Sequence, residues 1–333
     1  MAGGDLGQCG GSRIPECLRP VTQTSYFGSP ASTLSYPPRV RAELLAWKSR
    51  GEMHAIFGRE VFALVEPSPA APEATPLLVL HGFPTSSFDF RHALPRLAAD
   101  RRVVLHDHLG FGLSDKPIEY SYSLIEQAEV AIAVWQALGI RSGHLIAHDY
   151  GTSVATEILA RRARGLCPIE IQSLTLCNGS VHLELAHLTV AQRLLRHPRL
   201  GPMFARAANR RFFHRQLRRI FGRPDAVTAD ELDLAWDLLA REDGTLRVPQ
   251  LSSYQNDRVR FRERWIGPLT RLDIPAHVLW GRRDPIAVPA IAERLAAEIP
   301  GAQLDWLDDL GHYPMLEDPP RWAEAAASFL AAV

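Results

Sequence analysis

Short apolar runs recur along this chain, and segments with the 3.6-residue period of an amphipathic helix lie between several of them. The runs are LLVLHG (77–82), VVLHD (103–107), HLIAHD (144–149), SLTLCN (173–178), HVLWG (277–281) and QLDWLDD (303–309). Short, nearly continuous apolar runs are typical of parallel strands that are buried on both faces. The alternation therefore predicts an α/β fold, with a mostly parallel central sheet and helices on both of its faces.

Local signals refine this prediction. MHAIFGREVFALVE (53–66) has the pattern of a hairpin, with two β-prone runs around a turn that contains glycine. SLIEQAEVAIAVWQALG (123–139) and TSVATEILARRARG (152–165) have the helical period and end in glycine, and the first opens with a serine that can cap a helix. QLDWLDD alternates apolar and polar residues, so we expect it nearer an edge of the sheet.

The regular alternation stops between residues 178 and 277, where several helical patterns occur and no strand pattern is convincing. A long helical insertion that follows a strand is typical of a lid over a pocket. The N-terminus is rich in glycine, serine and proline and has no signal-peptide core. We expect a poorly ordered tail over 1–38, an α/β core formed by 39–179 and 267–333, and a helical lid over 180–266.

Charge and cysteine content limit the partners. The chain has 37 Lys and Arg against 37 Asp and Glu, so it has no overall field to attract nucleic acid. No apolar run reaches the roughly 18 residues of a membrane-spanning helix. The four cysteines (Cys9, Cys17, Cys167 and Cys177) lack the spacing of a metal site. We expect a cytoplasmic protein without cofactor, metal or membrane span that acts on a small apolar substrate; the oligomeric state stays open.

The HDYG sequence (148–151) marks a sharp turn from a strand into a helix. Small residues flank it at Ala147 and Gly151, as a tight and strained turn requires. This pattern matches a nucleophile elbow in which Asp149 takes the place of the usual serine. An aspartate also caps helices, so the junction alone leaves both readings open.

Two further residues fall where a catalytic triad on such a sheet would have them. The order is nucleophile, acid and histidine, and Asp284 and His312 follow two later strands in that order. Both lie at the carboxyl ends of strands, where open α/β sheets bind their ligands. The HGFP sequence (81–84) follows the first apolar run, so we expect the N–H groups of Phe83 and Tyr150 to form an oxyanion hole.

These motifs resemble the α/β-hydrolase fold branch that contains epoxide hydrolases and haloalkane dehalogenases. The resemblance rests on HGFPTSS, DHLGFGLSDKP, AHDYG, WGRRDP and GHYPMLEDP, and covers residues from about 44 to the end. The chain most closely resembles the mesoderm-specific transcript protein family, through AWKSRGE, YSLIEQA, LCNG and LSSYQNDRVRFRERWIG. The resemblance implies an α/β-hydrolase fold with an inserted helical lid.

An aspartate at the elbow favours alkyl transfer over acyl transfer. A carboxylate that displaces a leaving group at a saturated carbon forms an alkyl ester, and water can then cleave that ester. With a reference pKa of about 3.9, an aspartate is ionised at neutral pH. His312 would deprotonate the water and Asp284 would orient the imidazole. We therefore expect a hydrolase without a cofactor that acts through an ester on Asp149.

The resemblance favours epoxide hydrolysis to a diol, because lid tyrosines protonate the opening ring in epoxide hydrolases. Tyr254 matches the second of these tyrosines, although it also fits a half-buried packing residue. No tyrosine fills the first position, which His182, Glu184 or His187 could take instead. Dehalogenases use side-chain N–H donors where this chain has Phe83 and Tyr150. Dehalogenation, lactone hydrolysis and a binding protein without turnover remain alternatives.

Three other patterns have simpler readings. GFG (110–112) lacks the third glycine and the context of a dinucleotide loop. His106, Asp107 and His108 do not have zinc-ligand spacing. Arginines are dense over 206–219 and recur as Arg258, Arg260, Arg262 and Arg264. They could contact an anionic partner or membrane surface, but the balanced charge of the chain favours a solvated helix face.

Overall fold

The computed structural model describes residues 38–333, and an eight-stranded sheet is the centre of this part. The strands are β1 (Glu52–Ile56), β2 (Arg59–Glu66), β3 (Leu77–Leu80), β4 (Val103–His106), β5 (Ser142–His148), β6 (Glu170–Cys177), β7 (Ala276–Gly281) and β8 (Gln303–Leu307). They are ordered β1-β2-β4-β3-β5-β6-β7-β8. β1 pairs with β2 and β2 with β4 in antiparallel register, and all other pairs are parallel. The predicted α/β fold is confirmed.

All six apolar runs form strands, and the 53–66 segment forms the expected hairpin. β3 and β4 are buried at every position, because helices cover both faces of the sheet. β8 is one of the two edge strands, as its alternating pattern indicates, and only Leu307 in it is fully buried. The sequence therefore predicted both the strands and the layer in which they lie.

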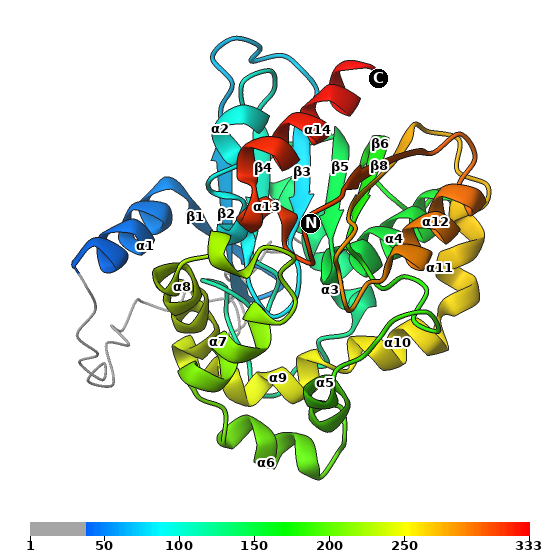
Figure 1. The fold of residues 1–333 in the computed structure, drawn as a ribbon. Coiled ribbons are helices and arrows are strands. Elements are labelled where there is room, and N and C mark those ends of the chain that lie inside the picture. Colours follow the sequence, from blue (N-terminus) through cyan, green and yellow to red (C-terminus); the bar gives the residue numbers. More distant parts are fainter. Residues whose placement is uncertain (1–37) are drawn as a thin grey trace, which may run out of the picture. The chain divides into compact units, whose positions relative to one another are not determined.

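The helices outside the insertion pack in two groups (Figure 1). They are α1 (Pro38–Arg50), α2 (Leu94–Leu97), α3 (Leu124–Ala137), α4 (Tyr150–Arg162), α12 (Pro289–Glu298), α13 (Pro314–Glu317) and α14 (Pro319–Ala331), with the 3-10 turn η2 (Ser87–Phe90). α2 and α14 contact each other, whereas α3 and α4 contact each other and α4 lies against β3, β5 and β6. The side chain of Ser123 caps α3 by accepting a hydrogen bond from Glu126 N, as the sequence predicted.

The segment between β6 and β7 is entirely helical or irregular (Figure 1). It contains α5 (Val190–Leu195), α6 (Leu200–Arg206), α7 (Arg210–Arg218), η3 (Pro224–Ala226), α8 (Ala229–Ala240), η4 (Arg241–Arg247), α9 (Val248–Leu251), α10 (Tyr254–Arg260) and α11 (Arg262–Leu269). We call this segment the insertion. In Figure 1 the helices α5–α10 lie beyond the carboxyl ends of the parallel strands, whereas α11, which continues past the predicted boundary at residue 266, packs against α4.

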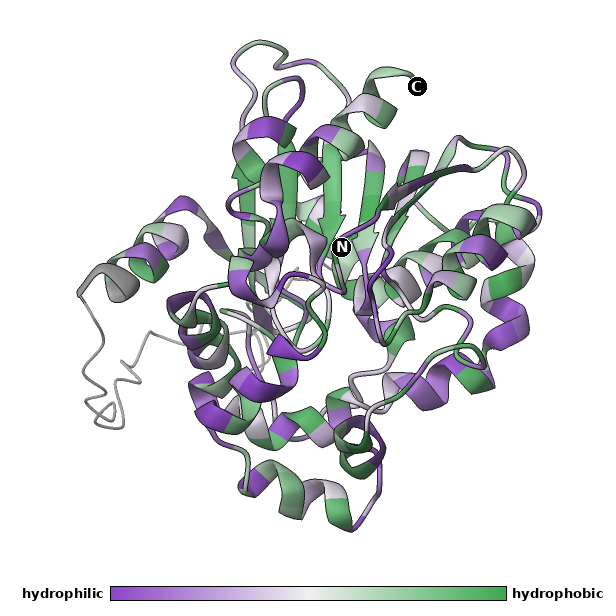
Figure 2. Ribbon diagram, in the orientation of Figure 1, coloured by the Kyte–Doolittle hydropathy of each residue, from purple (hydrophilic) through white to green (hydrophobic). Residues whose placement is uncertain are grey.

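The buried interior of the described residues is largely apolar, and its largest side chains include Trp135, Trp280 and Trp322. Figure 2 shows the strands as the most hydrophobic part of the ribbon. Among residues 38–333, no helix is both long enough and apolar enough to cross a membrane. The tail expected over 1–38 lies outside the described residues, apart from Pro38, where α1 begins.

Candidate active site

Asp149 lies in a strained turn between β5 and α4. Its backbone has φ +44° and ψ −106°, a conformation that side chains rarely adopt outside functional sites. The turn leaves no room at Gly151, because a Cβ there would be 2.5 Å from the carbonyl oxygen of Leu80. The elbow geometry expected from HDYG is therefore present, and Asp149 has no side-chain capping hydrogen bond to α4.

The Asp149 carboxylate is almost completely buried, with 3% of the residue exposed. Phe83 N donates a hydrogen bond of 2.9 Å to its Oδ2. Its Oδ1 lies 3.9 Å from His312 Nε2, which is too far for a hydrogen bond. One oxygen is thus fixed by a backbone donor, while the other faces the imidazole across a short gap.

His312 and Asp284 form a close pair. The His312 Nδ1 to Asp284 Oδ2 distance is 2.6 Å, and both side chains are buried. Burial alone would lower the pKa of His312, but the Asp284 and Asp149 carboxylates outweigh burial and raise this pKa to about 9. The raised pKa of His312 therefore favours the protonated, cationic form of its imidazole at neutral pH.

The loop that carries His312 is held from two sides. His148 Nε2 lies 2.7 Å from the carbonyl oxygen of His312, so His148 is protonated at this nitrogen and donates to it. His312 N donates to the carbonyl oxygen of Ile220, between α7 and η3. The imidazole is therefore tied both to the strand that precedes Asp149 and to the insertion.

Tyr150 and Tyr254 are buried beside Asp149. Their ring centroids lie 5.3 Å apart, and the Tyr254 ring lies 5.6 Å from that of Phe83. Burial and then the charge of Asp149 raise the pKa of Tyr254 to about 12. Tyr150 N begins α4 and is one of the first-turn amides without an intrahelical acceptor. Its role in an oxyanion hole stays a prediction.

A cavity of about 900 Å³, including open solvent at its mouth, lies between the strand ends and the insertion. Among the residues of 38–333 that line it, Asp149 and His312 are the only ones with a charged or titratable side chain. Most other lining residues are apolar, and the insertion supplies the majority of them, including Leu195, Phe204, Phe213 and Trp236. Tyr254 packs against Phe83 and Tyr150 without lining this cavity.

The three residues considered for the missing first tyrosine do not line the cavity either. His182 is buried, with Nδ1 3.1 Å from Glu184 and Nε2 2.8 Å from Glu298 on α12. Both of its ring nitrogens are thus occupied by carboxylates. His187 is exposed. The structure therefore does not bring His182, Glu184 or His187 to Asp149.

Two positioning contacts were not predicted from the sequence. Asn178 follows β6 and donates from Nδ2 to Asp284 Oδ2 at 2.8 Å, while its Oδ1 accepts from Gly281 N. Arg258 is buried, although the sequence placed it with exposed arginines. Its Nε donates to Ser153 Oγ at 2.6 Å and its Nη2 to the carbonyl oxygen of Asp149 at 3.3 Å. The sequence offered a signal only for Asn178, because it lies at the carboxyl end of a predicted strand.

A chain of hydrogen bonds supports Phe83 from behind. Tyr313 donates from its hydroxyl to the carbonyl oxygen of Phe83 at 2.7 Å, and Thr85 Oγ1 lies 3.5 Å from that hydroxyl. Thr85 Oγ1 also donates to Asp89, whose pKa burial raises to about 7. Residues on both sides of the cis Phe83–Pro84 bond therefore hold the donor to Asp149 in place.

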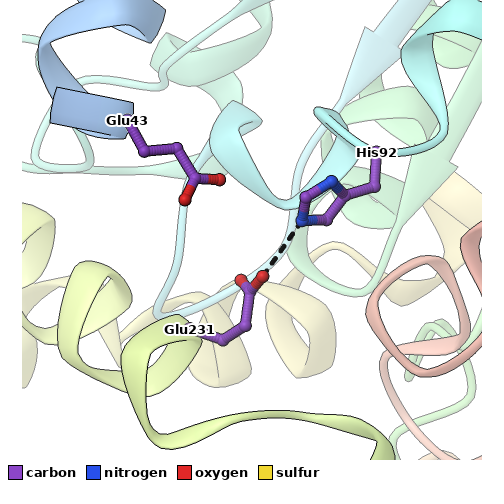
Figure 3. A group of neighbouring side chains, drawn as sticks. All are labelled: Glu43, His92 and Glu231. Carbon is purple, nitrogen blue, oxygen red and sulfur yellow. Dashed lines mark hydrogen bonds and ion pairs between the residues drawn. The ribbon is translucent and has the colours of Figure 1, made fainter. Parts of the chain in front are cut away.

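Glu43, His92 and Glu231 form a group of the type that can hold a metal ion (Figure 3). Arg91 lies between the two carboxylates, with Nε 2.6 Å from Glu43 and Nη2 bonded to Glu231. Burial alone would raise the pKa of Glu231, but His92 and Arg91 lower it to about 2. A metal ion would have to displace this guanidinium, so we interpret the group as an ion-pair cluster that joins α1, residues 91–92 and α8.

The fold and the site geometry define the class of protein, and sequence comparison agrees. Residues 75–319 match the family model described as "alpha/beta hydrolase fold". The chain therefore belongs to the α/β-hydrolase fold family and is a hydrolase of this fold.

Two individual relatives are similar to most of the chain. The chain is 43% identical over 263 residues to "Putative hydrolase LipZ" of Mycobacterium tuberculosis, covering 78% of this chain and 90% of that protein. It is 35% identical over 302 residues to the mesoderm-specific transcript protein of Mus musculus, covering 88% and 90%. The family resemblance drawn from the sequence is thus confirmed.

Solved structures support the fold. A haloalkane dehalogenase DbeA loop variant from Bradyrhizobium elkanii superposes with a TM-score of 0.70 and 23% identity. The match covers 85% of this chain and 96% of that chain. At this identity the similarity concerns the fold alone.

Proposed function

We propose that the protein hydrolyses an apolar epoxide to a diol through an alkyl ester on Asp149. One observation carries the proposal: the buried Asp149 carboxylate has Oδ2 fixed by Phe83 N and Oδ1 facing His312 in an apolar cavity. A carboxylate so placed is available to attack carbon, because His312 does not hydrogen-bond to Oδ1 in this geometry.

In the first step, Asp149 Oδ1 attacks a ring carbon and the carbon–oxygen bond of the epoxide breaks. The departing oxygen takes a proton, for which we assign Tyr254 as the donor. Tyr254 packs against the two residues that flank the Asp149 carboxylate, Phe83 and Tyr150, but does not line the cavity. In this proposal a water molecule therefore relays its proton to the departing oxygen. The product of the step is a hydroxyalkyl ester of Asp149.

Before the second step, His312 gives its proton, by way of solvent, to the Tyr254 phenolate that ring opening leaves. Water then attacks the ester carbonyl carbon, and the neutral His312 accepts its proton. Ester formation removes the negative charge of Asp149, which is one of the charges that raise the pKa of His312. The pKa of His312 therefore falls when the ester forms, and more of the imidazole is in the neutral form that can accept a proton at the point where a base is needed. Asp284 holds its tautomer, with Asn178 fixing Asp284.

The developing negative charge falls on the former Oδ2, which already accepts the hydrogen bond from Phe83 N. Tyr150 N is the second proposed donor. Loss of one such donor typically costs about 2.7–4 kcal/mol of transition-state stabilisation. The tetrahedral species then expels the diol as an alkoxide, which takes the proton of the newly formed carboxylic acid. Asp149 regains its carboxylate, and His312 again carries the proton with which the cycle began.

We assign residues 180–266 as the lid in this proposal. The apolar side chains that the insertion places over Asp149 would exclude water during alkylation and select an apolar substrate. The cytoplasmic location expected from the sequence stays a prediction.

The test is intact-protein mass spectrometry of His312→Gln after incubation with a panel of epoxides, haloalkanes and lactones. Without the base, the ester should accumulate. An adduct equal to the whole mass of an epoxide supports the proposal, and its loss on adding Asp149→Asn identifies the nucleophile. His187→Gln, which changes an exposed histidine of the insertion, is the matched control and should show turnover without an adduct.

The other outcomes replace the proposal. An adduct equal to a haloalkane minus its hydrogen halide would show dehalogenation. Lactone turnover by the wild-type chain, with no adduct from epoxides, would indicate ester chemistry of another kind. Binding of compounds without adduct or turnover would identify a binding protein that has kept the hydrolase fold.

A further inference from the structure

Positive charge is concentrated in one part of a chain whose net charge is zero. Residues 185–224 contain ten arginines and neither aspartate nor glutamate. Some of these arginines are paired elsewhere, such as Arg223 with Asp318. Four of them, on and beside α5 and α6, are exposed and form no ion pair with a carboxylate in the described part of the chain: Arg193, Arg196, Arg199 and Arg206.

Large apolar side chains are exposed on the same two helices. Val190 is 71% exposed, Met203 is 66% exposed and Leu200 is 44% exposed. On α6 the exposed residues Leu200, Met203 and Arg206 are three residues apart, so they share one side of the helix. We call these three apolar residues and the four unpaired arginines the α5–α6 face.

The opposite side of each helix lines the cavity. Ala191 and Leu195 of α5 contribute to the lining, as do Phe204 and Ala205 of α6. The two helices contact each other at the outer end of the insertion, at the bottom of Figure 1. Figure 2 shows both hydrophobic and hydrophilic residues along them. α5 and α6 have apolar side chains both toward the cavity and toward the exterior. At this point a single layer of helices separates the Asp149 cavity from the exterior.

We propose that the α5–α6 face docks on the surface of an anionic phospholipid membrane. Unpaired arginines attract anionic headgroups, and aliphatic side chains among them enter the boundary between headgroups and acyl chains. The exposed large apolar residues of the face are aliphatic or methionine, without an aromatic ring for base stacking, which favours lipid over single-stranded nucleic acid. Docking places the apolar cavity next to a source of apolar compounds.

The test is co-sedimentation of the full chain with vesicles. Vesicles of phosphatidylglycerol and phosphatidylcholine in equal amounts should bind the protein, and vesicles of phosphatidylcholine alone should bind it much more weakly. Binding to the anionic vesicles should fall as sodium chloride is raised, because exposed charges are screened. Equal binding to both vesicle types, or no binding to either, would overturn the proposal.

Two sets of substitutions separate charge from apolar contact. Arg193→Gln, Arg196→Gln and Arg199→Gln together should lower vesicle partitioning roughly a hundredfold. Val190→Ser with Met203→Ser should lower it roughly tenfold. All five side chains are exposed, so unfolding temperatures should be unchanged. If binding survives both sets, another surface binds and the proposal is wrong.

Matched controls lie just after the C-terminal end of α4, the end opposite to Asp149. Leu166 is 65% exposed and Arg164 is exposed nearby, so Leu166→Ser with Arg164→Gln changes the same chemistry elsewhere. This control should bind anionic vesicles like the wild type, and an equal loss would overturn the proposal. A dimer in sedimentation velocity that Val190→Ser and Met203→Ser abolish, without vesicle binding, would show instead that the face contacts a second copy.

Vesicle binding does not depend on the proposed reaction. Asp149→Asn should bind vesicles as tightly as the wild type, because Asp149 is buried and distant in sequence from the face. A failed ester-trapping experiment with intact vesicle binding would therefore reject only the reaction. Ester trapping without vesicle binding would reject only the docking surface.

Discussion

The strand ends and the insertion hold their side chains in different ways. At the strand ends, one carboxylate, that of Asp284, accepts from Ile286 N, Ala287 N, Asn178 Nδ2 and His312 Nδ1. Over the cavity, the insertion presents mainly phenylalanine, leucine and alanine side chains, which pack without direction. Directional bonds fix a geometry, whereas apolar contacts fix a volume. We therefore expect changes at the strand ends to alter rate and changes in the insertion to alter substrate range.

The largest effect should come from Asp284→Asn. The amide removes the anion that orients and stabilises the His312 imidazole, so the rate of the proposed epoxide hydrolysis should fall by roughly 10³–10⁴. Ester hydrolysis should be affected more than ester formation, which rapid-quench mass spectrometry would show as an accumulating adduct. Asp308→Asn is the control, because Asp308 is an exposed partner of Arg282, and it should leave the rate of both steps unchanged. Equal slowing of both steps would mean that Asp284 does not act through His312.

The histidines of the core should respond to pH in the opposite direction to His312. Burial lowers the pKa of His106 from 6.5 to about 3, and both of its ring nitrogens lack partners. Because the unfolded chain takes up this proton first, folding stability should be lost as the pH falls from 6.5 toward 3, by up to about 1.4 kcal/mol per pH unit. Urea unfolding across this range measures the loss.

His106→Leu should make the acid decline shallower, because leucine does not titrate. An unchanged slope would show that other groups, such as carboxylates, account for the decline. His312 has a raised pKa, so its own contribution to stability is complete below pH 6.5 and is lost as the pH rises toward 9. The His312→Gln variant should therefore differ most from the wild type in acid and least in alkali.

A smaller loss of stability should follow from Glu157→Gln. This fully buried carboxylate on α4 pairs with Arg264 and Arg161 and accepts from Trp265 Nε1, which joins the elbow helix to α11 of the insertion. The amide should lower the free energy of unfolding by about 3 kcal/mol. Glu129→Gln changes the exposed partner of Arg161 and should cost less than about 1 kcal/mol. Urea unfolding measures both free energies. Similar losses for the two variants would contradict the role of Glu157 in joining α4 to α11.

The smallest effect should come from filling the cavity. Ala208→Trp adds volume among the lining residues, so KM for bulky epoxides should rise several-fold while kcat for the smallest epoxide changes little. Ala207→Trp changes the exposed neighbour and should leave both constants unchanged. A fall in kcat for every substrate would mean that this side of the insertion fixes reaction geometry as well as volume.

Which features could be predicted from the sequence depends on whether a feature is set by a local pattern or by contacts between distant segments. Strands, the hairpin and the elbow depend on local patterns, and Gly151 is required by its own turn, so these features were predicted. The contacts of Asn178, Arg258 and Tyr313 join segments that are about a hundred or more residues apart. Such contacts exist only once the layers pack, and no pattern in a single segment encodes them.

The cavity was anticipated as a pocket beneath helices, but its lining could not be derived. Helical periodicity indicates which residues of α7 are buried without indicating whether they face the sheet or a void. Arg258 shows the limit most clearly, because three neighbouring arginines of the same stretch are at least partly exposed while its own side chain reaches the backbone of Asp149. Composition alone does not distinguish them.

The hydrogen bond from His312 N to Ile220 makes the imidazole loop and the cavity wall one mechanical unit. Ile220 lines the cavity, and nearby Gly222 packs so closely on this loop that a Cβ would lie 2.5 Å from the carbonyl oxygen of Asp309. A movement of the wall at Ile220 that opened the cavity would pull on the backbone of His312. The width of the cavity and the position of the imidazole are therefore coupled through one backbone hydrogen bond.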